Sequence, residues 1–300
     1  MKNSFQIKQQ INYLKKYGQF LDDYLEFYQR LLQLQQKKKA KLNREKLSLL
    51  SQRTEMDHRL SAGLPLIDLN DVYIDDSFVN SFFRSLLTLF KRYPAQFAAD
   101  DINRLRRAFL KKEFVGKKLI KNFVANNATY FVELARQINI EPGLLVFMAK
   151  TISLPFFDFY RAMFQSQLSQ AEFVWFKPLC PLCGNAPAMA RLEKEVGQKF
   201  LWCSTCNTQW TFTRIQCPFC LNKNQDQLRY FYDEKNKFYR VYVCDNCMRY
   251  LKTIDERENN HQADILMTTE DMASHFLDEL AAKEGFKNAV WWTEIEKNNV

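Results

Sequence analysis

All eight cysteines of this 300-residue chain lie in one stretch and form four pairs of the pattern Cys-x-x-Cys. The pairs are Cys180/Cys183, Cys203/Cys206, Cys217/Cys220 and Cys244/Cys247. Two thiolates separated by two residues can sit on one tight turn and face the same ion. A second such turn then completes a tetrahedron with metal–sulfur distances of about 2.3 Å. We therefore predict two tetrathiolate metal sites that use all eight cysteines and leave none as a lone nucleophile.

An internal repeat indicates how the pairs combine. Each half of the region from residue 173 reads as a cysteine turn, a hairpin, a second cysteine turn and a return strand. The predicted strands are 188–192, 199–202 and 210–215 in the first half, and 228–232, 238–243 and 250–254 in the second. The repeat pairs 180/183 with 203/206, and 217/220 with 244/247. Because ten residues link Cys206 to Cys217, we expect the two modules to pack together.

The chain before the cysteines is predicted to be helical, because apolar residues recur every three or four positions over windows poor in glycine. The predicted helices are a stripe from Phe20 to Leu34, then 76–92, 97–110, 114–138 and 142–170, with Pro155 bending or splitting the last. A further helix is predicted at 270–283. The fold class is α+β, with a helical domain at 1–172, metal modules at 173–215 and 216–256, and a C-terminal helix and tail at 257–300. Modules of this size bury little apolar surface, so metal is expected to supply much of their folding free energy.

The cellular compartment follows from the cysteines and the absence of targeting signals. A disulfide-stapled domain needs an oxidising compartment and is usually a short secreted chain. Residues 1–10 are polar and have no apolar core of signal-peptide length. No run of about 18 consecutive apolar residues occurs, which argues against a membrane span. We therefore expect a soluble cytoplasmic protein with reduced thiols.

Two other classes of function compete with a metal-stabilised scaffold. The net charge is +9, and basic runs at Lys37–Lys46 and Arg104–Lys121 keep a nucleic-acid-binding zinc ribbon as the alternative function. Both runs fall on predicted helices among apolar residues, which is typical of solvated helix faces and disfavours nucleic-acid binding. Thioredoxin-like dithiol chemistry is disfavoured, because the chain lacks a thioredoxin-like alternation of strands and helices around any of the cysteine pairs. The three histidines, His58, His261 and His275, form no His-Glu-x-x-His pattern, and there is no phosphate-binding loop. The chain is therefore predicted not to be an enzyme.

Several motifs together resemble one family. They are Cys180-Pro-Leu-Cys-Gly-Asn-Ala-Pro187, Cys203-Ser-Thr-Cys-Asn-Thr-Gln-Trp210, Arg214, Cys217-Pro-Phe-Cys220 and Cys244-Asp-Asn-Cys-Met-Arg-Tyr-Leu-Lys252. In this order they resemble the formate dehydrogenase accessory protein family, FdhE. The likeness continues into 270–278 and 284–286, and more loosely into Tyr24-Leu25, Gln33 to Gln36 and Gly63-Leu-Pro-Leu66.

The resemblance implies a helical domain followed by two rubredoxin-like metal modules that hold iron or zinc. It implies a cytoplasmic assembly factor that binds the catalytic subunit of a respiratory formate dehydrogenase before export, with a weak homodimer as the oligomeric state. That catalytic subunit carries a molybdenum or tungsten cofactor, selenocysteine or cysteine, and a twin-arginine export signal.

The second module departs from the first in its turns. Gly184 and Asn207, which follow the second cysteine of the first two pairs, tolerate the left-handed conformation favoured there. The corresponding residues of the second module are Leu221 and Met248, so we expect its turns to be more strained or differently shaped and its metal to be held more weakly. We hypothesise that this module responds to redox state. Equal partner binding by the apo, oxidised and metal-loaded forms would contradict this hypothesis.

Overall fold

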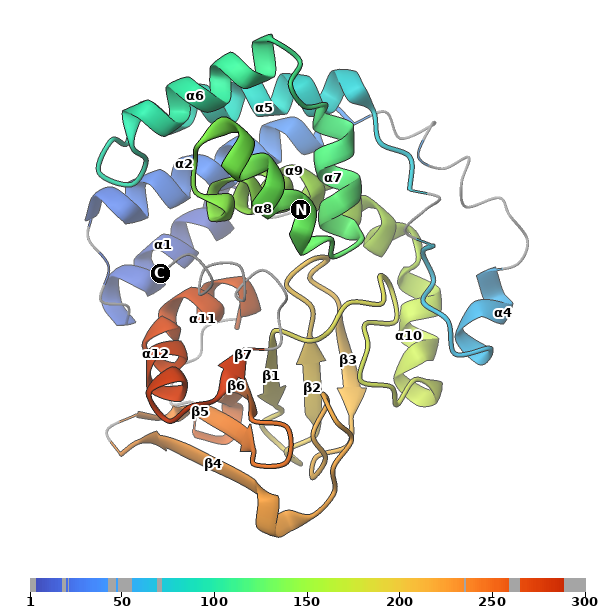
Figure 1. Ribbon diagram of the computed structural model, residues 1–300. Helices are drawn as coiled ribbons and strands as arrows, with labels where there is room; N and C mark the ends of the chain where they lie inside the picture. The colour runs from blue at the N-terminus through green and yellow to red at the C-terminus, as the bar shows by residue number, and fades with distance from the viewer. Residues whose placement is uncertain are drawn as a thin grey trace. The chain divides into compact units, whose positions relative to one another are not determined.

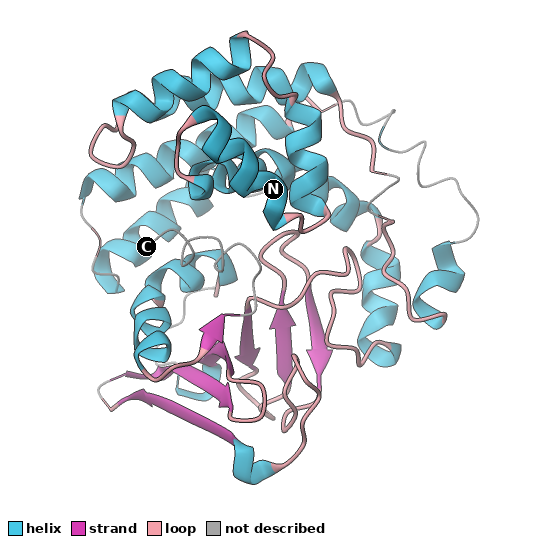
Figure 2. Ribbon diagram, viewed as in Figure 1, coloured by secondary structure: helices cyan, strands magenta, loops and turns pink. Residues whose placement is uncertain are grey.

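A computed structural model describes residues 4–17, 20, 22–42, 47, 56–68, 72–234, 236–258 and 265–288. His261, the end of the basic run 37–46 and the tail after residue 288 therefore lie outside the described residues. The chain divides into two compact units. One comprises residues 1–52, 68–159 and 291–300, and the other 53–67 and 160–290. The fold is mixed, with a helical N-terminal region and a sheet in the C-terminal part, as predicted (Figure 2).

The first unit is built from helices. They are α1 (Ser4–Tyr17), α2 (Asp22–Lys39), α5 (Asp76–Phe90), α6 (Ala99–Leu110), α7 (Gly116–Val124), α8 (Ala128–Ile138) and most of α9 (Pro142–Met163). Aromatic rings fill much of their interface, because large rings bury much apolar surface and favour edge-on contacts. Phe27 of α2 lies 5.0 to 6.4 Å, between ring centroids, from the rings of Phe90, Tyr93, Phe97 and Phe147. The predicted aromatic stripes thus form core.

The predicted helix 114–138 is wrong in one respect, since it is two helices. Asn126 adopts a left-handed backbone with φ of 55°, which ends α7, and the Asn127 side chain then accepts a hydrogen bond from the Tyr130 amide at 3.3 Å to start α8. Asparagine suits both roles because its short side chain bonds to nearby backbone. Helix α9 runs through Pro155 and ends at Met163, so the break before α10 (Gln165–Val174) lies beyond the proline.

Helix α9 is, among the described residues, the one helix long and apolar enough to cross a membrane by length and composition. Within its most apolar window, 61% of the residues are buried inside the protein. A buried core helix of this length meets the same test, and the core position of α9 fits that explanation.

The second unit contains one seven-stranded sheet shared by both cysteine modules (Figure 1). The strands are β1 (Met189–Leu192), β2 (Lys199–Trp202), β3 (Gln209–Phe212), β4 (Leu228–Asp233), β5 (Asn236–Cys244), β6 (Arg249–Asp255) and β7 (Lys287–Asn288). Their order is β3-β2-β1-β6-β5-β4, and β7 pairs with β6. Each module is an antiparallel three-stranded ribbon, and β1 joins the ribbons by pairing parallel to β6. The modules are packed together, as their short connection predicts.

Helices flank the sheet of the second unit. α11 (Met267–Ala273) and α12 (His275–Lys283) follow the second module, and α12 packs against β5, β6 and β7. The predicted helix 270–283 is therefore two helices, separated at Ser274. α10 packs against α4 (Met56–Ser61) and β3. Two short 3-10 turns, Gln225–Gln227 and Glu256–Glu258, complete the described elements.

Candidate metal centres

The four Cys-x-x-Cys turns share one backbone geometry. In each turn the amide four residues after the first cysteine donates to that cysteine's carbonyl. The N···O distances are 2.9 Å at Cys180, 2.8 Å at Cys203, 3.0 Å at Cys217 and 2.8 Å at Cys244. This fold of the turn brings both thiols of a pair to the same side, as a shared ion requires.

The residue that closes each turn is left-handed, with φ of 75° at Gly184, 60° at Asn207, 60° at Leu221 and 54° at Met248. The turns of the second module therefore have the same shape as those of the first, and the expectation of a different shape is wrong. The expected strain holds, because a left-handed backbone costs a residue with a Cβ roughly 1–2 kcal/mol.

The structure gathers the eight thiols into the two groups that the repeat predicts. Within each group the four sulfur atoms lie within 4.8 Å of one another. In the first group the Sγ atoms of Cys180 and Cys206 are 3.4 Å apart, and those of Cys183 and Cys203 are 3.6 Å apart.

In the second group the Sγ atoms of Cys217 and Cys247 are 3.7 Å apart, and those of Cys220 and Cys244 are 3.6 Å apart. A tetrahedron with metal–sulfur bonds of about 2.3 Å has sulfur–sulfur edges of about 3.8 Å. All eight cysteines are free thiols. Both groups therefore fit a tetrahedrally bound soft metal ion, and each could hold one.

The comparisons with known proteins point to one family. A family model described as "FdhE, central domain" matches residues 179–214. A "Protein FdhE homolog" of Aquifex aeolicus is 28% identical over 243 residues, which cover 80% of this chain and 77% of that protein. The chain is similar to the FdhE family over most of its length.

Further FdhE proteins match over shorter spans. The "Protein FdhE homolog" of Haemophilus ducreyi is 28% identical over 54% of this chain and 51% of its own length. "Protein FdhE" of Escherichia coli O1:K1 / APEC is 30% identical over 39% of this chain and 38% of its own length. The crystal structure of the FdhE protein from Pseudomonas aeruginosa matches with a TM-score of 0.57 and 21% identity, over 95% of this chain and 92% of that one. The described fold is thus the fold of an FdhE protein.

The two four-cysteine groups of this chain differ in exposure. All four cysteines of the first group are buried, and the most exposed of them, Cys183, shows 1% of its surface. In the second group Cys217 and Cys244 are buried, whereas Cys220 and Cys247 are partly exposed. Solvent and small reagents therefore reach the second group more readily.

The thiols of the second group differ in acidity as well. Burial raises the pKa of Cys217 to about 11. Burial also opposes ionisation of Cys220, but hydrogen bonds from the Asn246 side chain, the Asn222 amide and Cys244 outweigh it and lower its pKa to about 7. The Asn246 Nδ2 lies 3.4 Å from the Cys220 sulfur. Since thiolates are the ligands, binding an ion to thiols that hold protons must release those protons.

A segment far from the cysteines in sequence covers the first turn. The Leu66 amide donates to the Pro181 carbonyl at 2.8 Å, and the Ile67 amide donates to the Leu182 carbonyl at 2.9 Å. The Leu66 side chain is fully buried. The motif at 63–66 gave a sequence signal for this segment, but no sequence rule joined it to Cys180–Cys183.

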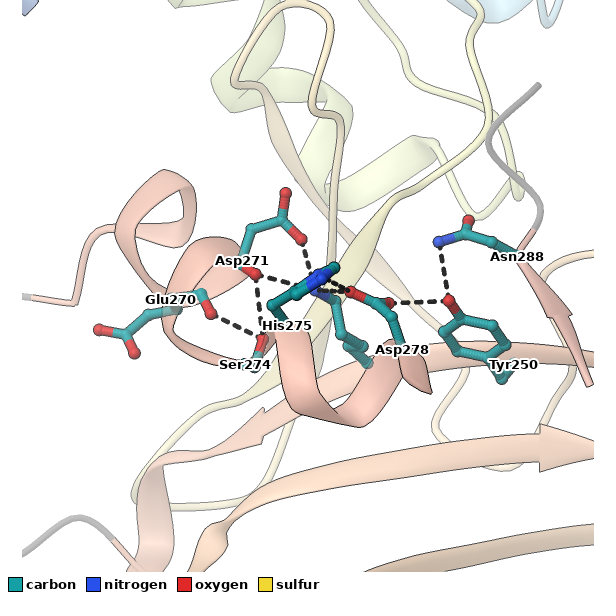
Figure 3. A network of polar contacts seen from close by, with 8 residues as sticks. Tyr250, Glu270, Asp271, Ser274, His275, Asp278 and Asn288 are labelled. Carbon is teal, nitrogen blue, oxygen red and sulfur yellow. Dashed lines mark hydrogen bonds and ion pairs between the residues drawn. The ribbon is translucent and has the colours of Figure 1, made fainter. Parts of the chain in front are cut away.

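A polar network attaches α11 and α12 to the second module (Figure 3). The Lys252 ammonium on β6 lies 2.8 Å from carboxylate oxygens of both Asp271 and Asp278. The Tyr250 hydroxyl donates to Asp278 at 2.8 Å and accepts a hydrogen bond from Asn288 at 3.1 Å. The network thus links the 270–278 motif to the return strand β6 of the second module.

The remaining residues of interest are not part of either group. His275 is exposed and lies 3.5 Å from Asp278, and His58 is on α4. Trp210 is buried, and its indole nitrogen donates to the Lys177 carbonyl at 3.0 Å. Arg214 is exposed. The indole of Trp210 thus has a packing role in the first module.

Proposed function

We propose that this protein is a cytoplasmic assembly factor, and not an enzyme, for a respiratory formate dehydrogenase whose catalytic subunit it binds before export. The observation that carries the proposal is that the first four-cysteine group lies wholly within the residues matched to the FdhE central domain. The second group repeats its geometry further along the same sheet. The names of the relatives and the matching fold support the family role.

The eight cysteines are proposed to hold two metal ions, one in each module. Four thiolates accept iron and zinc alike, so the proposal includes both. The ions would cross-link the two turns of each ribbon and so stabilise modules with small cores. We propose that the ribbons, with the helical domain, present the surface that binds the catalytic subunit. The partial exposure of Cys220 and Cys247 supports the hypothesis that the second module responds to redox state.

The test is an anaerobic co-purification of the tagged chain, with metal analysis and identification of the accompanying proteins in the same sample. The proposal predicts about two ions per chain and recovery of a formate dehydrogenase catalytic subunit. Metal-loaded protein that brings down nucleic acid, with affinity that falls steeply as salt rises, would support the nucleic-acid-binding ribbon instead.

Two variants separate the roles of the sites in that experiment. Cys217→Ser with Cys220→Ser should halve the metal content and release the catalytic subunit, whereas the exposed Lys223→Ala in the same loop should change neither. Circular dichroism of each variant shows whether the sheet survives. If the doubly substituted chain stays folded and keeps the subunit, the second site has no part in binding.

A further inference from the structure

The two modules begin with nearly the same six residues, but only one of these turns is covered within the described structure. Residues 180–185 read Cys-Pro-Leu-Cys-Gly-Asn and residues 217–222 read Cys-Pro-Phe-Cys-Leu-Asn. In both, the first cysteine's amide also donates to the asparagine carbonyl, at 2.9 Å in each case. The two turns therefore present their central carbonyls in the same way.

In the first turn those carbonyls are acceptors for an extended segment of the chain itself. The amides of Leu66 and Ile67 bond to the Pro181 and Leu182 carbonyls, as described above. The segment is held in place from its other side, because the Arg59 guanidinium donates to the Pro65 carbonyl at 2.6 Å and the Lys177 ammonium donates to the Gly63 carbonyl at 2.9 Å. The pairing resembles the addition of a strand to a free edge, with side chains adding specificity.

The equivalent carbonyls of the second turn belong to Pro218 and Phe219, and no donor among the described residues bonds to either of them. Beside them the Leu221 side chain is 50% exposed, and Met248 on the facing turn is 42% exposed. Both are apolar residues kept in a strained left-handed conformation, a feature that clusters at functional surfaces. The second turn thus offers what the first turn uses, two aligned acceptors beside apolar surface.

We propose that the turn Cys217–Asn222 is a docking site for an extended apolar segment of the client polypeptide. That segment would donate two consecutive amides to the Pro218 and Phe219 carbonyls, as residues 66 and 67 do in the first module. The proposal rests on the proposed function for the identity of the client, and on the repeat for the site and the binding mode.

The repeat also restricts the residue that the bound segment can have at the position equivalent to Pro65. A Cβ placed on Gly184 would lie 2.9 Å from the Pro65 Cγ, so the proline sits against a position without a side chain. The second turn has Leu221 at this position. A bound segment in the same register therefore needs a residue smaller than proline there, such as alanine or glycine.

Peptide titration of the full-length, metal-loaded chain tests the site. The probe is the octapeptide Ser-Ala-Gly-Leu-Ala-Leu-Ile-Asp, which is residues 61–68 with alanine in place of the proline. With the chain labelled with 15N at leucine and phenylalanine, the amide signals of Phe219 and Leu221 should shift and saturate. Leu221→Asn with Met248→Asn should weaken binding about fivefold or more, since asparagine keeps the left-handed turn, as Asn207 does, but removes the apolar side chains. Val196→Asn, an equally polar change at an exposed residue of the first module, should leave binding unchanged.

A swap of side chains tests the register. The octapeptide with the natural proline should bind the unmodified chain more weakly than the alanine peptide, and Leu221→Gly should abolish or reverse that preference. Absence of saturable shifts at Phe219 and Leu221 would overturn the proposed site, and an unchanged preference in Leu221→Gly would overturn the register.

Co-purification of the Leu221→Asn, Met248→Asn chain separates this inference from the proposed function. Loss of the formate dehydrogenase catalytic subunit with both ions retained supports the docking site. Retention of the subunit at the level of the unmodified chain refutes the docking site and leaves the assembly role standing. If the unmodified chain binds the peptide but no such subunit accompanies it, the assembly role fails and the site remains.

Discussion

Gly184→Ala tests how tightly the segment around Leu66 is fitted onto the first cysteine turn. The new Cβ would meet the Pro65 Cγ at 2.9 Å, closer than such contacts occur. Overpacking of this kind costs about 1–3 kcal/mol. The left-handed backbone, with φ of 75°, adds a cost of roughly 1–2 kcal/mol for any residue with a Cβ. The two costs can be separated, because detaching the segment relieves the contact and leaves the backbone strain in place.

Native-state hydrogen exchange at the Leu66 and Ile67 amides measures the detachment alone. Since about 1.4 kcal/mol corresponds to a tenfold change in an equilibrium constant, Gly184→Ala should lower protection of these amides about tenfold. Gly285→Ala is the matched control, because Gly285 has φ of 85° and its Cβ would meet nothing within 4 Å. It should reduce overall stability by about 1 kcal/mol and leave these two amides unchanged. Adding Pro65→Ala to Gly184→Ala should restore most of the protection. Unchanged protection in Gly184→Ala, or no rescue by Pro65→Ala, would show that Pro65 is not packed tightly against Gly184.

Three further predictions concern the second module. A chelator should remove the ion of the second group first, because Cys220 and Cys247 are partly exposed while the first group is buried; equal release rates for the two ions would contradict this. Lys252→Met should lower the free energy of unfolding by about 2 kcal/mol, less than for fully buried pairs because Asp271 and Asp278 are partly exposed; an unchanged urea midpoint relative to an exposed Lys283→Met control would contradict it. Burial opposes the charge of Lys252, but the two carboxylates outweigh it and raise its pKa. This stabilisation should therefore be constant from neutral pH up to about pH 10 and be lost as pH rises through the raised pKa. If the difference in unfolding free energy between the unmodified chain and Lys252→Met disappeared near neutral pH in a series of urea titrations, the Lys252 ammonium would not be the source of the stabilisation.

The metal groups were predictable because their information is local. Each Cys-x-x-Cys pattern specifies one turn, and the repeated order of turns and hairpins specified which pairs meet. The helices of the first unit followed from apolar periodicity, yet the end of α7 at Asn126 did not, because a left-handed residue inside an apolar pattern leaves the periodicity intact. Helix α1 was not predicted at all, although Ile7, Ile11 and Leu14 have the helical spacing and are buried.

Features that depend on contacts between distant residues could not be predicted. The side chains of Gly63–Leu66 give no indication that this stretch covers Cys180–Cys183, because two backbone hydrogen bonds join the two segments. The turns at Leu221 and Met248 were expected to be strained or altered in shape. In the structure each turn is closed by the same backbone hydrogen bond as in the first module, and the backbone of Leu221 and Met248 is left-handed although both residues carry large side chains. The parallel pairing of β1 with β6 likewise joins residues that lie far apart in the chain.

Native mass spectrometry of the anaerobically purified chain tests whether the eight cysteines form two separate metal centres. That arrangement predicts a mass that corresponds to two ions and eight reduced thiols, and a mass with one ion for Cys217→Ser combined with Cys220→Ser. A metal-free chain with the thiols joined as disulfides, or a chain whose ion number is unchanged by those substitutions, would contradict it.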